Sequence, residues 1–152
     1  MSEPKRPSLA SCPCYRDPKA ALEWLEKAFG FEPTMVILGD DGSLMHSEMR
    51  FGDGMIMVGP EWSPDHRSPA NIDGKNTQTI HVQMEADIDG HCERARAAGA
   101  EILQEPETQF YGDRAYRARD PEGHIWTFGQ TVEAMSPEQW DKAAGVTTKM
   151  RL

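Results

Sequence analysis

The chain has 152 residues and a formal net charge of −9 at pH 7, from 16 Lys and Arg against 25 Asp and Glu. Acidity of this size disfavours binding to a phosphate backbone, so we expect no nucleic-acid partner. The longest apolar runs span only a few residues, as in Met35–Leu38, so we expect no contact with a membrane. A chain of this length is expected to bury one core, as a single domain over residues 1–152.

The compartment is inferred from the start of the chain and from its cysteines. No charged-then-apolar signal pattern opens the sequence, which predicts a cytoplasmic protein. The three cysteines suit a reducing compartment. Cys12 and Cys14 flank Pro13 and have no second pair of ligands nearby, so we interpret them as small apolar residues of a strand.

A first module is expected over about residues 8–59. After a strand over residues 8–15, Asp17 as the N-cap and Pro18 at the first helical position predict the start of a helix. Gly30 is expected to end this helix. Strands are then expected over residues 34–38, 44–51 and 55–58, separated by hairpin turns at Asp40-Asp41-Gly42 and Gly52-Asp53-Gly54.

A long loop over about residues 60–76 links this module to a second one, over about residues 77–130. The loop is rich in Pro and polar residues, and we expect it to gate a cavity. In the second module, a helix is expected over residues 88–98 and strands over 79–85, 101–103 or a little beyond, 115–119 and 124–128. Ser136-Pro137-Glu138-Gln139 predicts a C-terminal helix over about residues 136–145, with Trp140 and Ala143 docked on the body.

The two modules repeat one pattern at a fixed interval. Gly30 and Gly99 are 69 residues apart, and so are Gly54 and Gly123. This repetition predicts an α+β fold of two β-α-β-β-β modules that share a core and leave a cleft between them.

Several motifs resemble one known superfamily. Asp120-Pro121-Glu122-Gly123-His124 is similar to the Asp-Pro-Asp-Gly-Asn turn before the last strand of the vicinal oxygen chelate superfamily, which includes glyoxalase I, bleomycin-resistance proteins and extradiol dioxygenases. Tyr15-Arg16-Asp17-Pro18 with Ala28-Phe29-Gly30-Phe31 looks like its first strand and helix. Residues 45–53 and 111–130 resemble the PhnB-like branch. The resemblance covers roughly residues 8–130 and implies curled mixed sheets around a cavity.

The resemblance also allows a test for a metal. Metal-bearing members carry ligands on the first, fourth, fifth and eighth strands. The first strand here has no His, Glu, Gln or Asp, the fourth-strand position falls near Met57 or Val58, and the eighth-strand position is Thr127. Only His81, at the fifth-strand position, keeps a suitable side chain, so we expect no metal and no cofactor.

A different arrangement of ligands stays open. His46 and Glu48 share strand parity and could join His81 in a non-standard metal site. Without a metal, the same side chains are expected to line a small-molecule cavity. The full set expected in this cavity is His46, Glu48, Met57, Trp62, His81, Gln83, Arg114 and Thr127. Trp126 and Phe128 have the opposite parity to Thr127 and are expected in the core.

The sequence supports three hypotheses for function. The first is a glyoxalase/bleomycin-resistance-like protein that binds a small molecule between its modules without a metal, as a homodimer that completes the cavity. The second is a divalent-metal-dependent lyase, isomerase or dioxygenase of the same superfamily. The third is a structural or interaction protein with a filled cavity. No nucleophile elbow, phosphate-cradling loop or dinucleotide fingerprint is present, so the sequence leaves open whether the chain is an enzyme.

Overall fold

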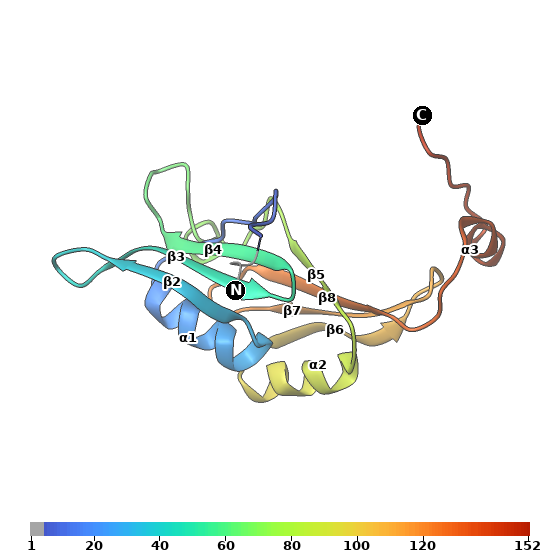
Figure 1. Cartoon of the computed structure of the whole chain (residues 1–152), viewed down its shortest axis with the longest axis horizontal. Coiled ribbons are helices and arrows are strands. Elements are labelled where there is room, and N and C mark those ends of the chain that lie inside the picture. Colours follow the sequence, from blue (N-terminus) through green and yellow to red (C-terminus); the bar gives the residue numbers. More distant parts are fainter. Residues whose placement is uncertain (1–4) are drawn as a thin grey trace.

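The computed structural model describes residues 5–152 and, over these residues, holds two four-stranded sheets and three α-helices (Figure 1). The first sheet, in the order β1-β4-β3-β2, consists of β1 (Cys14–Tyr15), β2 (Glu32–Leu38), β3 (Leu44–Phe51) and β4 (Gly54–Pro60). The second, in the order β5-β8-β7-β6, consists of β5 (Ile80–Met84), β6 (Glu101–Thr108), β7 (Asp113–Arg119) and β8 (Ile125–Thr131). The matching orders confirm the predicted fold of two β-α-β-β-β modules.

Both sheets are mixed in the same way. β1 pairs in parallel with β4 and β5 pairs in parallel with β8, whereas the remaining neighbours are antiparallel. The hairpin between β2 and β3 turns at Gly42, with a φ of 81°, and the hairpin between β3 and β4 turns at Gly52, with a φ of 58°. Glycine suits both turns because it has no Cβ to oppose a positive φ.

One helix packs beneath each sheet. α1 (Pro18–Phe29) begins where the Asp17 side chain accepts the Ala20 N–H, and it ends at Gly30 in the left-handed conformation. Its apolar stripe is buried against the first sheet: Ala21, Leu22, Leu25, Ala28 and Phe29. α2 (Ile88–Ala97) takes the same place in the second module, and the two helices lie next to each other on one side of the molecule (Figure 1).

The core lies between the helices and one face of each sheet. Trp126 and Phe128 are fully buried there, as their parity predicts, and both contact the Phe29 ring. Because successive side chains of a strand point to opposite faces, the alternate residues of β3 and β5 lie on the other face of each sheet. This second face carries His46 and Glu48 in the first sheet and His81 and Gln83 in the second, and none of the three helices within residues 5–152 packs on it; it is called the open face below.

His91 is a buried residue that the sequence analysis missed. It lies on α2 and is 8% exposed. Its Nε2–H donates to the Phe29 carbonyl at 2.7 Å, and its Nδ1 accepts from the Tyr116 hydroxyl at 2.6 Å. Because burial disfavours the imidazolium, the pKa of His91 is lowered. The residue therefore joins α1, α2 and β7 as a neutral hydrogen-bonding group.

Two ends of the chain differ from the predictions. The expected strand over residues 8–15 is reduced to β1, because over residues 5–13 the chain pairs with β4 at a single position, the Ser11–Ile56 bridge. α3 (Pro137–Ala144) forms, but no residue in it is buried and it lies away from the body (Figure 1). The predicted docking of Trp140 and Ala143 is therefore wrong, since Trp140 Nε1 donates to Thr148 within the tail at 2.7 Å.

Among residues 5–152, no helix is long and apolar enough to cross a membrane.

Candidate functional site

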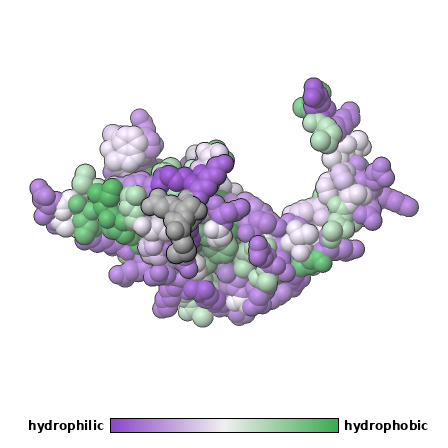
Figure 2. Space-filling view, viewed as in Figure 1, coloured by the Kyte–Doolittle hydropathy of each residue, from purple (hydrophilic) through white to green (hydrophobic). Residues whose placement is uncertain are grey.

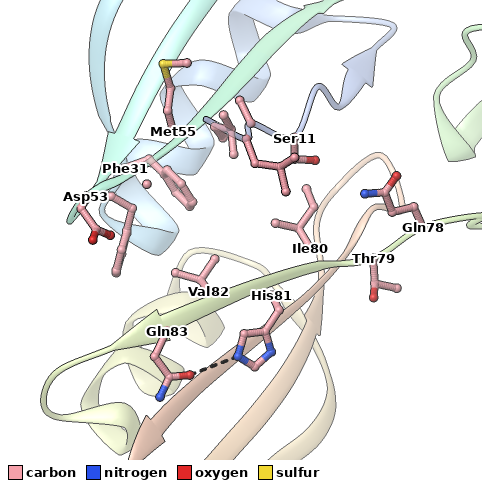
Figure 3. Close-up of a pocket in the computed structure, with 15 residues that line it drawn as sticks. Ser11, Phe31, Asp53, Met55, Gln78, Thr79, Ile80, His81, Val82 and Gln83 are labelled. Atoms are coloured by element: carbon pink, nitrogen blue, oxygen red, sulfur yellow. Dashed lines mark hydrogen bonds between the residues drawn. The ribbon is translucent and has the colours of Figure 1, made fainter. Parts of the chain in front are cut away.

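A cleft of about 520 Å³ lies between the two modules (Figure 3). One wall comes from the first module, with Phe31, Phe51 and Met55, and the other comes from β5, with Ile80 and Val82. The polar side chains on the cleft are Ser11, Asp53, Gln78, Thr79, His81 and Gln83. A volume of several hundred Å³, with apolar walls and a few polar groups, is typical of a small-molecule site.

His81 belongs to a chain of hydrogen bonds on the open face of the second sheet. Its Nε2 lies 3.2 Å from Gln83 Oε1, and Gln83 Nε2 donates to Asp113 and to Thr131, each at 3.3 Å. Because the Gln83 amide nitrogen faces the Asp113 carboxylate, the Gln83 amide oxygen faces His81 and accepts a hydrogen bond from it. Nε2 therefore carries the proton in neutral His81, and Nδ1 remains an acceptor for a ligand.

Gly129 makes room for this arrangement. It pairs with Gln83 in the sheet register, and a Cβ at this position would meet Gln83 Oε1 and His81 Cε1 at 3.4 Å. Both side chains thus lie across the backbone of β8. These are ordinary van der Waals distances, so an alanine would fit at position 129 and only a longer side chain would displace His81 and Gln83.

His46, Glu48 and Met57 lie on the open face of the first sheet, outside the lining of the cleft. His46 Nε2 donates to Glu48 at 3.2 Å, so the shared parity of the two residues did predict a pair. Arg6 donates two further bonds to Glu48, at 2.8 Å and 3.0 Å. The bonds from Arg6, followed by the bond from His46, lower the pKa of Glu48 to about 2.

The remaining predicted residues are dispersed. Arg114 forms a paired interaction with Asp89 of α2, at 2.9 Å and 3.0 Å, which places it on the helix side of the second sheet. Thr127 stands next to His81 in the register and accepts a bond from Arg117 Nε at 3.2 Å. Trp62 is 70% exposed and stacks on His66, with ring centroids 3.8 Å apart. Of the eight predicted residues, only His81 and Gln83 line the cleft.

The donors for a metal are not assembled within one chain. Residues 5–152 contain no group of three His, Cys, Asp or Glu side chains placed to hold an ion, so the non-standard set of His46, Glu48 and His81 does not converge. The superfamily position fits no better, because the Arg117 guanidinium bonds to Thr127 beside His81 and would repel a divalent cation.

A second cavity of about 460 Å³ lies beside the long loop. His66, Arg67 and Lys75 from the loop line this cavity together with Cys12, which is exposed, and Cys14, which is half-buried. Other bonds tether the loop: Glu61 accepts from the Ser68 backbone at 2.8 Å, and Asn76 donates to the Gly123 carbonyl at 2.9 Å. The loop thus borders this second cavity more than the cleft, and its gating role stays a prediction.

Comparison with known proteins settles the family. The sequence model of the Glyoxalase/Bleomycin resistance protein/Dioxygenase superfamily matches residues 14–128. The chain belongs to this superfamily. An uncharacterized protein of Mycobacterium bovis is 29% identical over 127 residues, which cover 81% of this chain and 82% of that protein. An uncharacterized protein of Mycobacterium tuberculosis is also 29% identical over 127 residues, covering 81% of this chain and 74% of that protein.

Two solved structures illustrate the similarity in fold. TioX from Micromonospora sp. ML1 is 32% identical and superposes with a TM-score of 0.66, over 86% of this chain and 100% of that chain. TnmS3, an antibiotic-binding protein from Streptomyces sp. CB03234, is 18% identical and superposes with a TM-score of 0.61, over 84% and 98%. At 18% identity the second comparison supports the superfamily fold alone.

Proposed function

We propose that this protein binds a small, largely apolar molecule in the cleft between its modules, without a metal ion. The observation that carries the proposal is the cleft itself, where Ile80 and Val82 point toward Phe31 and Met55, while His81 and Gln83 lie on the other side of β5 at the edge of the cleft (Figure 3). A ligand with an apolar body and one hydrogen-bond donor suits this lining, because the body can cover Phe31 and Ile80 and a donor that reaches past β5 can pair with His81 Nδ1. The antibiotic-binding activity of TnmS3, on the same fold, is in keeping with this class of ligand.

A fluorescent probe tests the proposal. We expect 8-anilino-1-naphthalenesulfonate to bind one site per chain, with its emission enhanced as it leaves water. His81→Ala should weaken binding about fivefold to tenfold, as expected for the loss of one hydrogen bond. Arg96→Ala, on the exposed side of α2, removes a surface ion pair and should leave the affinity unchanged. Equal affinity for wild type and His81→Ala would contradict the proposal.

We further propose that two copies form a homodimer. A row of large hydrophobic side chains on β2 and at the start of β3 is at least 41% exposed: Met35, Val36, Ile37, Leu38 and Met45. Figure 2 shows this apolar surface at the end of the molecule where the β2–β3 hairpin lies. The unburied α3 lies at the opposite end (Figure 1). In a two-fold dimer, the β2–β3 hairpin of each chain can contact α3 of the partner chain. An exposed apolar surface of this kind is typical of an interface.

The finer classification is also a proposal. We assign the chain to the PhnB-like branch on Tyr111-Gly112-Asp113-Arg114 and on Asp120-Pro121-Glu122-Gly123-His124. We place it in the cytoplasm because its three cysteines are free thiols, which a reducing compartment maintains.

A further inference from the structure

The N-terminal segment holds a cation against the open face of the first sheet. Arg6 Nη1 and Nη2 donate to the two carboxylate oxygens of Glu48, 42 positions along the chain. Arg50 Nη2 donates to the Lys5 carbonyl at 3.2 Å and so holds the neighbouring backbone in place. Two parallel bonds between planar groups are the geometry by which a carboxylate selects a guanidinium ion.

Glu48 has the surroundings of a cation receptor. It is 5% exposed, although it stands on the open face of the sheet and not in the core. His46 donates to one carboxylate oxygen from the side. Met35 and Met57 occupy the positions directly opposite Glu48 on β2 and β4, so flexible apolar side chains flank the carboxylate. The outward side of Glu48 is left for a cation, and Arg6 lies there.

Arg6 is also a replaceable occupant. It comes from the end of the chain, outside every helix and strand, and its side chain is 58% exposed whereas that of Glu48 is 7% exposed. A cation that left this position would leave the Glu48 carboxylate with the bond from His46 alone. Another cation of the right shape could then take the place of Arg6.

We propose that Glu48 and His46 form a binding site for the guanidinium or primary-amine group of a small molecule, and that Arg6 fills this site in the free protein. The tethered Arg6 guanidinium competes with the ligand. The apparent affinity of the ligand is the intrinsic affinity multiplied by the fraction of time that Arg6 is out of the site. This site lies outside the cleft that contains His81, so the two proposals can fail independently.

The test is binding of methylguanidine, followed by the NMR shifts of His46 and of the Met57 methyl group. If Arg6 fills the site nine-tenths of the time, Arg6→Ala should bind methylguanidine about tenfold more tightly than wild type. Arg6→Ala combined with Glu48→Gln should abolish the gain. Arg16→Ala is the matched control, because it removes an arginine from another ion pair, with Glu122, and changes the net charge equally.

The variants distinguish a ligand site from a structural ion pair. Arg6→Lys keeps the charge but loses the paired geometry, so it should show a smaller gain and also serves if Arg6→Ala folds poorly. Methylammonium in place of methylguanidine tells whether the site prefers the planar ion. The proposal is overturned if neither Arg6 variant binds methylguanidine more tightly than Arg16→Ala, or if the gain survives Glu48→Gln.

Discussion

The Tyr15 hydroxyl donates a 2.7 Å hydrogen bond to the Asp120 carboxylate, across 105 residues of sequence and from one module to the other. Trp126 Nε1 donates to the same oxygen at 3.0 Å, and the second oxygen accepts the backbone N–H groups of Glu122 and His124. Asp120 is 4% exposed. Asp120 therefore joins the two modules through the bond from Tyr15.

We predict that Asp120→Asn lowers the free energy of unfolding by about 2–3 kcal/mol, because an amide cannot accept all of these bonds and leaves buried donors without a partner. Urea denaturation measures the change. Glu93→Gln, on the exposed side of α2, is the control and should shift stability by less than about 0.5 kcal/mol. Equal effects of the two substitutions would show that Asp120 does not join the modules.

The burial of His91 predicts a pH dependence of stability. The pKa of His91 is lower in the folded protein than in the unfolded chain. At acidic pH, His91 is therefore protonated to a greater extent in the unfolded chain. Stability should therefore be fully present above the unfolded pKa of about 6.5 and should fall as the pH is lowered, by at most about 1.4 kcal/mol per pH unit from this group.

Unfolding of His91→Gln, measured at pH values of about 7.5 and 5.5, isolates this contribution as a shallower slope than that of wild type. An unchanged slope in His91→Gln would mean that His91 is not the group responsible.

The proposed homodimer predicts a particle of twice the 17.0 kDa chain mass in sedimentation equilibrium at micromolar concentration. Ile37→Asp, at a position that is 46% exposed in one chain, should shift the protein toward monomer without unfolding it, because a buried charge at an interface is unfavourable. Trp62→Asp is the control at another exposed hydrophobic residue. A wild-type protein that sediments as a monomer would refute the pairing.

The proposal of binding without a metal predicts that no stoichiometric ion stays with the protein. After dialysis against Zn²⁺, Ni²⁺, Mn²⁺ or Fe²⁺ and then against buffer, elemental analysis should find far less than one ion per chain, because residues 5–152 hold no group of three His, Cys, Asp or Glu side chains that could bind an ion and because Arg117 lies near His81. One ion per chain that His81→Ala abolishes would restore the metalloenzyme hypothesis.

The parts of the fold that the sequence predicted are those whose signals are local. Asp17 and Gly30 set the ends of α1, and the glycine turns set the hairpins, because cap and turn preferences depend on the residue itself. Parity also placed His46 beside Glu48. It could not tell which faces of the two sheets meet, so it did not separate this pair from the cleft around His81.

The features that were missed depend on contacts between distant residues. His91 is polar, and only the Phe29 carbonyl and the Tyr116 hydroxyl make its burial favourable. Nothing near Arg6 in the sequence indicates that it pairs with Glu48 on β3. The predicted position of α3 was wrong because a local signal says nothing about packing. The capping box of Ser136 and Gln139 stabilises the start of the helix, although no residue of α3 is buried.

The most direct test of the cleft as the binding site is methyl NMR of the protein titrated with 8-anilino-1-naphthalenesulfonate. We predict that the methyl signals of Met55, Ile80 and Val82 shift together with the ring signals of His81, since all four residues line the cleft. Shifts confined to Ile72 in the second cavity, or to Met57 on the open face of the first sheet, would contradict a binding site in the cleft.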